Sequence, residues 1–356
     1  MILGNAGYKT TLIGLQHESS DPSSLGFDEV INLNAPRELA NVVGELSVNW
    51  IREHARPSEP FFLTIGMHEP HRPFTPELYT PGDPSELDVP DYLPDTPEVR
   101  EDLAAFHGLI NAADRATGKI LEALRETGLM ERTIVVFTTD HGIPFPGAKS
   151  TLHDAGIGVA LVVRVPDSPH AGTTSDRLVS HVDIVPTMLQ LAEVDVPALV
   201  QGESFADFLT GGDSPDRESI FSEKNWHDPD QYDPVRSIRT ARFKLIKSWE
   251  ERPALPLPGD IRSSISAPSV AAQADTLRPP VELYDLEADP DEQHNLAEDD
   301  AFATVRRSLE EDLHEFQVRT LDPLLVGPIP APRLFGELPH SIRGRSNPHQ
   351  DPTWRQ

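Results

Sequence analysis

Side chains that could bind a metal ion or move a proton follow short apolar runs in this sequence. Asp140 and His141, with Gly142 behind them, come directly after the apolar run 133–139. A carboxylate favours calcium or magnesium, and an adjacent imidazole extends the range toward zinc or manganese. The pair therefore predicts a divalent-metal site. A helix-capping aspartate beside a surface histidine is the alternative that the pair alone leaves open.

A second cluster, His68, His71 and Arg72, follows the apolar run 61–67. Imidazole and guanidinium groups at one sheet edge can bind an oxyanion, and an imidazole can protonate a leaving group. Two prolines in the same turn favour a structural role for His71. His68 is therefore the better catalytic candidate.

Two single residues complete the candidate site. His17 ends the segment Gly14–His17, where a lone histidine is more often structural than catalytic. Lys149 follows the loop Gly142–Gly147, which is rich in glycine and proline, and a flexible ammonium there could reach a bound anion. The alternative for Lys149 is an ordinary lysine in a solvated loop.

The elements that must position these residues alternate between strand and helix patterns. Four short runs look like buried parallel strands: Thr10–Leu15, Phe61–Met67, Thr133–Thr139 and Val159–Val165. Helical periodicity is found at about Pro36–Arg56, Val99–Thr127 and Asp183–Ala192. This order predicts an α/β fold with a doubly wound, mostly parallel sheet. Ligands bind such sheets beyond the carboxyl ends of the strands, where the candidate residues lie.

The pattern changes after Gly211. Short alternating segments and one amphipathic helix predict a small antiparallel sheet with a helix packed on it; they are Ser219–Ser222, Val235–Thr240, Phe243–Lys247, Glu282–Tyr284 and about Ala301–Arg319. We therefore expect a core of residues 1–212, a C-terminal subdomain of residues 213–322 and a proline-rich tail of residues 323–356. The proline-rich stretch Thr75–Pro97 is expected to be a long surface excursion that could act as a lid.

Composition restricts the classes of function. The chain has 356 residues, enough for one large domain or a large and a small one. It carries 58 acidic against 30 basic residues, a formal net charge of -28, which would repel phosphate and argues against nucleic acid as a partner. Only six of the basic residues are lysines, and such a composition is typical of proteins adapted to high salt. Cysteine is absent, which excludes disulfides, thiolate metal sites and cysteine nucleophiles.

No apolar run reaches the roughly 18 residues that a membrane helix needs, and the first residues show no signal peptide. We therefore expect a cytoplasmic protein without a membrane partner, and its oligomeric state stays open. The segment Met1–Ala6 looks like the end of a helix, and a core strand follows almost at once. Because a parallel sheet needs an earlier strand and crossover, we expect the true beginning of the protein to be missing from this sequence.

Five segments together resemble the sulfatase family of the alkaline-phosphatase superfamily, and they follow one another in that family's order. They are Gly7–Gly14 with His17, Pro60–Phe61–Phe62–Leu63 leading to His68–His71, Thr139–Gly142, Ser180–Thr187, and Glu282–Leu286 with Asp289, Pro290, Asn295 and Leu296. Within the family, Asp140–Pro146 and Tyr284–Leu296 are similar to the N-sulfoglucosamine sulfohydrolases, the heparan N-sulfatases.

The resemblance implies hydrolysis of a sulfate ester or sulfamate, on a sulfated saccharide or a similar small sulfated substrate. In the family, a formylglycine hydrate attacks sulfur, while calcium and basic residues neutralise the sulfate oxygens. The resemblance implies that Asp140 and His141 bind Ca2+, with Mg2+ or another divalent metal as alternatives. Lys149 matches a residue that contacts sulfate. His68 matches the histidine that protonates the leaving group, and His17 the one that helps to eject sulfate.

Two departures from the family pattern weaken the expectation of activity. Leu15 stands where the family has a lysine, which removes a positive charge from the sulfate pocket. The chain also lacks the family's first metal carboxylates and its Cys/Ser-x-Pro/Ala-x-Arg nucleophile motif. Three hypotheses follow: a sulfatase whose N-terminal part is missing from the sequence, a noncatalytic relic that binds metal or oxyanion, and a phosphatase or phosphodiesterase of the same superfamily.

Overall fold

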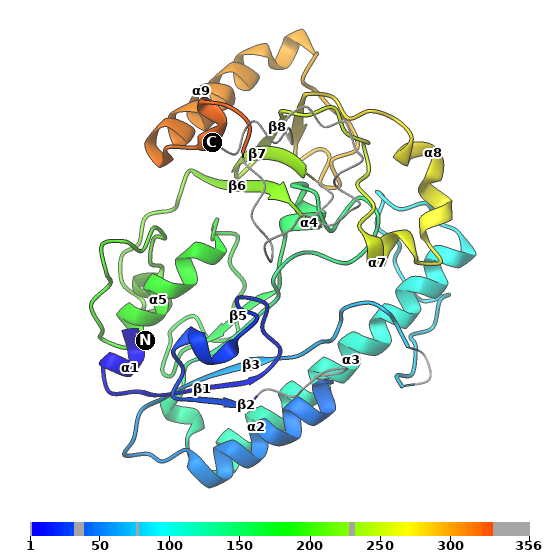
Figure 1. The fold of residues 1–356 in the computed structure, drawn as a ribbon. Coiled ribbons are helices and arrows are strands. Elements are labelled where there is room, and N and C mark those ends of the chain that lie inside the picture. Colours follow the sequence, from blue (N-terminus) through cyan, green and yellow to red (C-terminus); the bar gives the residue numbers. More distant parts are fainter. Residues whose placement is uncertain (1, 32–38, 76–77, 228–231, 330–356) are drawn as a thin grey trace. The chain divides into compact units, whose positions relative to one another are not determined.

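The computed structural model describes residues 2–31, 39–75, 78–227 and 232–329 (Figure 1). The chain divides into two compact units. Unit 1 consists of Met1–Leu87, Arg100–Thr138 and Ala160–Asp216; unit 2 consists of Asp88–Val99, Thr139–Val159 and Arg217–Gln356. The chain therefore enters unit 2 twice before its C-terminal part. The boundaries at residues 212 and 322 stay predictions, and most of the predicted tail, 330–356, lies outside the described residues.

Unit 1 contains a parallel sheet in the order β2-β1-β3, formed by Glu29–Ile31, Lys9–Gly14 and Phe61–Gly66. The helices α2 (Ala40–His54) and α3 (Pro97–Glu126) share an apolar core with this sheet, as their periodicity predicted. Buried residues of that core include Ile13 on β1, Val43 and Ile51 on α2, and Ile120 and Leu124 on α3.

The predicted parallel pairing is wrong for the other two strands of unit 1. β4 (Val135–Thr138) and β5 (Leu161–Arg164) pair antiparallel with each other. The reason is the connection 139–160, all of it described, whose single helix is the four-residue α4 (Asp154–Ile157). Parallel strands need a crossover that carries the chain back to the opposite end, and this connection returns it to the same end. The pair is also less buried than expected, since Phe137 and Val162 are exposed.

Unit 2 contains the predicted antiparallel sheet, in the order β6-β7-β8-β9, and the predicted helix α9 (Ala303–Thr320). The strands are Ser219–Trp226, Tyr232–Thr240, Phe243–Ser248 and Val281–Asp285. Side chains alternate between the two faces of a strand. Ile238, Leu245 and Leu283 lie on one face and pack with Leu309 and Leu313 of α9.

The opposite face of this sheet packs against segment 139–159. Val235, Ile246 and Tyr284 form a second apolar cluster there with Leu152, and Ile157 packs on it. The cross-strand register places a set of polar residues on the same face, which we call the loop face: Lys224, Asp233, Arg239, Lys244 and Glu282. Both faces of the sheet are therefore covered within unit 2.

The remaining helices are short. They are α1 (Ile2–Asn5), α5 (Ile184–Leu191), α6 (Ala206–Thr210), α7 (Gly259–Arg262), α8 (Ala271–Ala274) and the 3-10 turns Pro22–Leu25, Met130–Arg132, His181–Asp183, Ala267–Val270, Asp300–Phe302 and Pro323–Leu325. The described residues between 78 and 96 form no helix or strand, in agreement with the predicted excursion. Among the described helices, none combines the length and the apolar character needed to cross a membrane.

Candidate active site

Two facing glycines hold the carboxyl ends of β1 and β3 together. Gly14 and Gly66 are register partners, and the backbone N–H of Leu15 donates to Gly66 O at 2.8 Å. A Cβ atom on Gly14 would lie 2.2 Å from Gly66 O, and one on Gly66 would lie 1.9 Å from Leu15 O. Only glycine permits such a close backbone approach. The segments that follow both strands therefore start from one edge of the sheet.

His17 and His68 lie on these two segments of unit 1. His17 is exposed beyond β1, and His68 is half-buried just beyond β3. The ring of His68 lies 5.2 Å from that of His71, measured between centroids. The strand pattern thus placed both histidines at the correct sheet edge, and their catalytic roles stay predictions.

The other polar residues beyond β3 hold the structure together. Arg72 is buried, and its guanidinium donates two parallel hydrogen bonds to Asp102 on α3, at 2.9 and 2.7 Å. His71 Nδ1 donates to Arg72 O at 2.5 Å. Buried Glu69 accepts a hydrogen bond from the N–H of Ala40, the first residue of α2, at 2.7 Å. The ion pair with Asp102 therefore ties this turn to α3, and a role of Arg72 in binding an oxyanion stays a prediction.

Asp140, His141 and Lys149 lie in unit 2, on segment 139–159. The segment closes on itself, because the N–H of Gly142 donates to Gly156 O at 2.9 Å. A Cβ atom on Gly142 would lie 1.9 Å from a backbone oxygen of the α4 turn, so the glycine of the Asp-His-Gly motif is sterically required.

Asp140 and His141 each have a side-chain atom that can bind a metal ion, and the two atoms lie close together. His141 Nδ1 lies 2.8 Å from Gly142 O, and because a carbonyl only accepts, Nδ1 carries a proton; in the neutral ring, Nε2 is then the nitrogen with the free lone pair. That Nε2 lies 3.6 Å from Asp140 Oδ2, and the Asp140 side chain is 87% exposed. Two donors that each lie about 2.0–2.6 Å from one ion, at roughly a right angle, are about 2.8–3.7 Å apart. The geometry therefore suits a shared cation.

This pair fits part of a calcium site. Calcium takes about 6–8 oxygen ligands. In the described part of the chain, no group of three or more His, Cys, Asp or Glu side chains is arranged to hold a metal ion. Asp140 and His141 would thus supply two ligands of a larger set. The helix-capping alternative for Asp140 is wrong, because the next helix, α4, begins only at Asp154.

Lys149 is buried and ion-paired, which contradicts its reading as a solvated loop lysine. Its side chain is 5% exposed, and Nζ lies 2.7 Å from Oδ2 of Asp260. Asp260 lies in the first turn of α7, far away in sequence, and its own side chain is 19% exposed. Sequence reasoning missed this partner, because the segment around Asp260 has no periodicity that marks it as part of a site.

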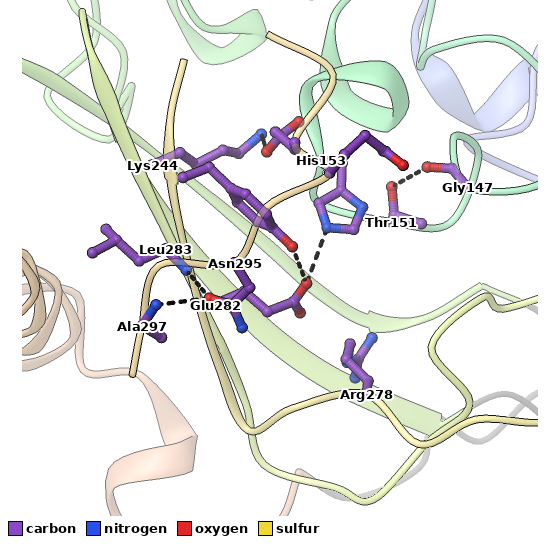
Figure 2. A network of polar contacts seen from close by, with 12 residues as sticks. Gly147, Thr151, His153, Lys244, Arg278, Glu282, Leu283, Asn295 and Ala297 are labelled. Atoms are coloured by element: carbon purple, nitrogen blue, oxygen red, sulfur yellow. Dashed lines mark hydrogen bonds and ion pairs between the residues drawn. The ribbon is translucent and has the colours of Figure 1, made fainter. Parts of the chain in front are cut away.

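The loop face anchors segment 139–159 through charged residues that sequence reasoning also missed (Figure 2). His153 Nε2 lies 3.1 Å from Glu282 Oε2, which also accepts from the hydroxyl of Tyr284 at 2.7 Å. Next to it, Lys244, whose side chain is fully buried, donates to Asp154 Oδ1 at 2.7 Å. The only signal in the sequence was the resemblance of the run around Glu282 to a family motif, and that resemblance did not predict which residues Glu282 contacts.

Burial and pairing shift the pKa values of the acids in this network. Burial raises the pKa of Asp154, but nearby cations, first among them Lys244, outweigh burial and hold it below its usual value. Burial also raises the pKa of Glu282, but its hydrogen bonds to His153 and Tyr284 and the nearby positive charges together outweigh burial and hold the pKa below its usual value. The pKa of Glu292 is raised, because burial outweighs the attraction of Lys244. Asp154 and Glu282 are therefore charged at neutral pH.

The family model described as sulfatase matches residues 1–194, which is more than half of the chain, and the protein therefore belongs to the sulfatase family of hydrolases. A second model, described as N-sulphoglucosamine sulphohydrolase, C-terminal, matches residues 147–257. N-sulphoglucosamine sulphohydrolase of Homo sapiens is 27% identical over an alignment of 381 positions, which covers 92% of this chain and 75% of that protein.

Two further relatives differ in how much of them this chain covers. An ulvan-active sulfatase of Formosa agariphila is 28% identical over 243 residues, 64% of this chain but only 40% of that protein. The structure of BT4656, in complex with its substrate D-glucosamine-2-N,6-O-disulfate, matches with a TM-score of 0.67 and 20% identity, covering 90% of this chain and 81% of that one. The structural match shows a shared sulfatase-like α/β fold.

Proposed function

We propose that this chain recognises and hydrolyses a sulfate group on an amino sugar or related saccharide, as part of a complete sulfatase. The net reaction joins water to the substrate: R–O–SO3- or R–NH–SO3- is cleaved at the bond to sulfur, and hydrogen sulfate and the free hydroxyl or amine leave. The observation that carries the proposal is the paired Asp140 carboxylate and His141 Nε2, 3.6 Å apart, on a segment that also carries Lys149.

Each candidate residue has a chemical role in this proposal. Asp140 and His141 would hold a divalent cation, which when bound would neutralise charge on the sulfate oxygens. Lys149 adds a fixed positive charge for the same oxygens, which is strongest in a buried environment. His68 donates a proton to the leaving oxygen or nitrogen, and His17 assists the departure of sulfate.

The fold supports this assignment in outline. The parallel order β2-β1-β3, with α2 in the crossover that leads to β3, is what a doubly wound sheet requires. We therefore infer a doubly wound architecture for unit 1. The comparisons support an amino-sugar substrate through the relatives that act on sulfated glucosamine.

The residues of this chain cannot supply the family's formylglycine nucleophile. Formylglycine is made from a cysteine or serine in the family's nucleophile motif, and this chain has no cysteine and no matching serine motif before His17. The same observation favours a second candidate function, a noncatalytic protein that binds a cation and a sulfated saccharide.

Metal binding is the first test. Calcium titrated into chelator-treated protein is expected to raise the melting temperature, because an ion that binds only the folded state stabilises it. Asp140→Asn and His141→Ala should each remove most of this shift. His294→Ala is the matched control, since His294 Nδ1 and Asp289 Oδ2 are also 3.6 Å apart but lie outside the candidate site. An unchanged calcium response in both site variants would contradict the proposal.

An activity assay tests whether this chain is catalytic by itself. The purified chain is expected to show no measurable hydrolysis of N-sulfoglucosamine or of aryl sulfates, because it lacks the nucleophile. Inorganic sulfate should still bind. Lys149→Met should weaken the affinity for sulfate at least tenfold, as expected for loss of a buried charged hydrogen bond. Robust turnover that His68→Ala abolishes would instead show that the chain is complete in its chemistry.

A further inference from the structure

A buried triad of charges touches the residue that follows Lys149. Lys224 Nζ, on β6, donates to Asp233 Oδ2 at 2.6 Å and to the backbone carbonyl of Ser150 at 2.5 Å. Arg278 donates two hydrogen bonds to the same Asp233 carboxylate, at 2.5 and 3.2 Å. The three side chains are 12%, 7% and 7% exposed. The triad thus ends on one main-chain atom of segment 139–159.

The charge balance of the triad is unfavourable for stability alone. Two cations share one carboxylate, and burying an ion pair costs more than packing apolar residues of the same volume. Burial lowers the pKa of Lys224, and the attraction of Asp233 opposes this only in part. An apolar side chain at position 224 would therefore cost less folding free energy than the buried lysine. The presence of Lys224 points to a role in fixing a particular conformation.

The conformation in question is that of Ser150. Its φ of 72° lies in the left-handed region, which is strained for any residue other than glycine and persists only where the surroundings enforce it. Its hydroxyl has no hydrogen-bond partner among the described residues, so the side chain does not stabilise the turn. The hydrogen bond from Lys224 to the Ser150 carbonyl restrains this peptide from outside the turn.

The turn sets the direction of the Lys149 side chain. The N–H of Lys149 donates to Ile143 O at 3.2 Å, and the N–H of Thr151 donates to Ala148 O at 3.0 Å. With the Ser150 carbonyl fixed between these bonds, the backbone of Lys149 has little freedom. Its ammonium is held independently by Asp260 at the far end of the side chain.

We propose that Lys224 is a positioning residue for Lys149, acting through the Ser150 carbonyl and held by Asp233 and Arg278. The inference rests on the proposed function only in so far as Lys149 contacts sulfate. Its structural part, the dependence of Lys149 on Lys224, can be measured without any substrate.

The low lysine content makes a direct experiment possible. With six lysines in the chain, selective labelling with 15N,13C-lysine gives few ammonium signals, and Lys149→Arg identifies the one from Lys149. A buried, ion-paired ammonium exchanges its protons slowly. In Lys224→Met, the Lys149 signal should shift, its proton exchange should accelerate at least tenfold, and the affinity for inorganic sulfate should fall about tenfold. Lys224→Arg should restore part of each, because it can still donate to the carbonyl.

Arg236→Met is the matched control. Arg236 is a buried cation on the neighbouring strand β7 that pairs with Asp322 on the face that carries α9. It donates to the main-chain carbonyl of Lys224 at 3.3 Å, so its replacement leaves the contacts of the Lys224 ammonium in place. Its replacement should destabilise the protein without moving the Lys149 signal. If Lys224→Met does not fold, Asp233→Asn gives the same test, because it weakens the ion pair that holds the Lys224 ammonium.

The possible outcomes are distinct. An unchanged Lys149 signal and unchanged proton exchange in folded Lys224→Met or Asp233→Asn would overturn the positioning role, as would an equal effect in Arg236→Met. If the Lys149 signal responds to Lys224→Met but wild-type protein shows no response to inorganic sulfate, the positioning role stands and the proposed contact of Lys149 with sulfate fails.

Discussion

The ammonium of Lys149 lies 2.7 Å from the carboxylate of Asp260, and both side chains are largely buried. A lysine that binds a substrate anion from a flexible loop would be expected to be exposed and mobile. Here it is fixed before any anion arrives, so binding would cost little side-chain entropy. The carboxylate also compensates the charge that burial would otherwise leave without a partner.

Asp260→Asn should destabilise the protein by about 3 kcal/mol, because it leaves the Lys149 charge buried with a weaker partner. The double variant Lys149→Met with Asp260→Leu should recover most of this loss, since it removes both charges. Urea unfolding of Lys149→Met, Asp260→Leu and the double variant measures the coupling. Additive effects of the two changes would show that the ion pair contributes nothing to stability.

Arg72→Lys should cost about 2 kcal/mol, although it keeps the charge, because lysine cannot make the two parallel hydrogen bonds to Asp102. Arg52→Lys is the control: Arg52 pairs with Glu126 at the surface, where both side chains are about half exposed, and its replacement should cost less than about 0.5 kcal/mol. Urea midpoints at constant slope give both values. Equal effects at the two sites would contradict a structural role for Arg72.

Gly66→Ala should destabilise the protein by about 3 kcal/mol or more, because the new Cβ would lie 1.9 Å from Leu15 O and must push β1 and β3 apart. Gly118→Ala is the control within α3, where an added Cβ meets no atom within 4 Å. That change should stabilise the helix by about 0.5–1 kcal/mol. Thermal unfolding of both variants checks the opposite signs, and a tolerated Gly66→Ala would contradict the close backbone approach.

The stability contributed by Asp154 should depend on pH in a defined window. Its pKa is held below the usual value of 3.8, so the folded protein binds this proton more weakly than the unfolded chain does. The contribution is fully present above about pH 5 and is lost as the pH falls through 3.8 and then through the lower folded pKa. The stability difference between wild type and Asp154→Asn should therefore shrink between pH 5 and pH 3, as measured by urea unfolding. A constant difference across that range would rule out this linkage.

The order of strands and helices followed from the sequence, because buried strands and amphipathic helices leave local apolar periods that need no tertiary information. The positions of His17, His68, Asp140 and His141 after strands followed in the same way. The sequence also contained the strand-end glycines Gly14 and Gly66, although only the structure showed that they face each other.

Tertiary structure alone decided what the charged side chains do. Arg72 and Lys149 look alike in the sequence, as cations near predicted strand ends, yet each has a carboxylate partner distant in sequence. The antiparallel pairing of β4 and β5 depended on where the connection 139–160 returns, which no local period encodes. The loop face holds that connection through contacts between residues more than seventy positions apart, such as Lys224 with Ser150. Apolar periodicity is a local property of the chain, whereas the pairing of buried charges is a property of the packed fold.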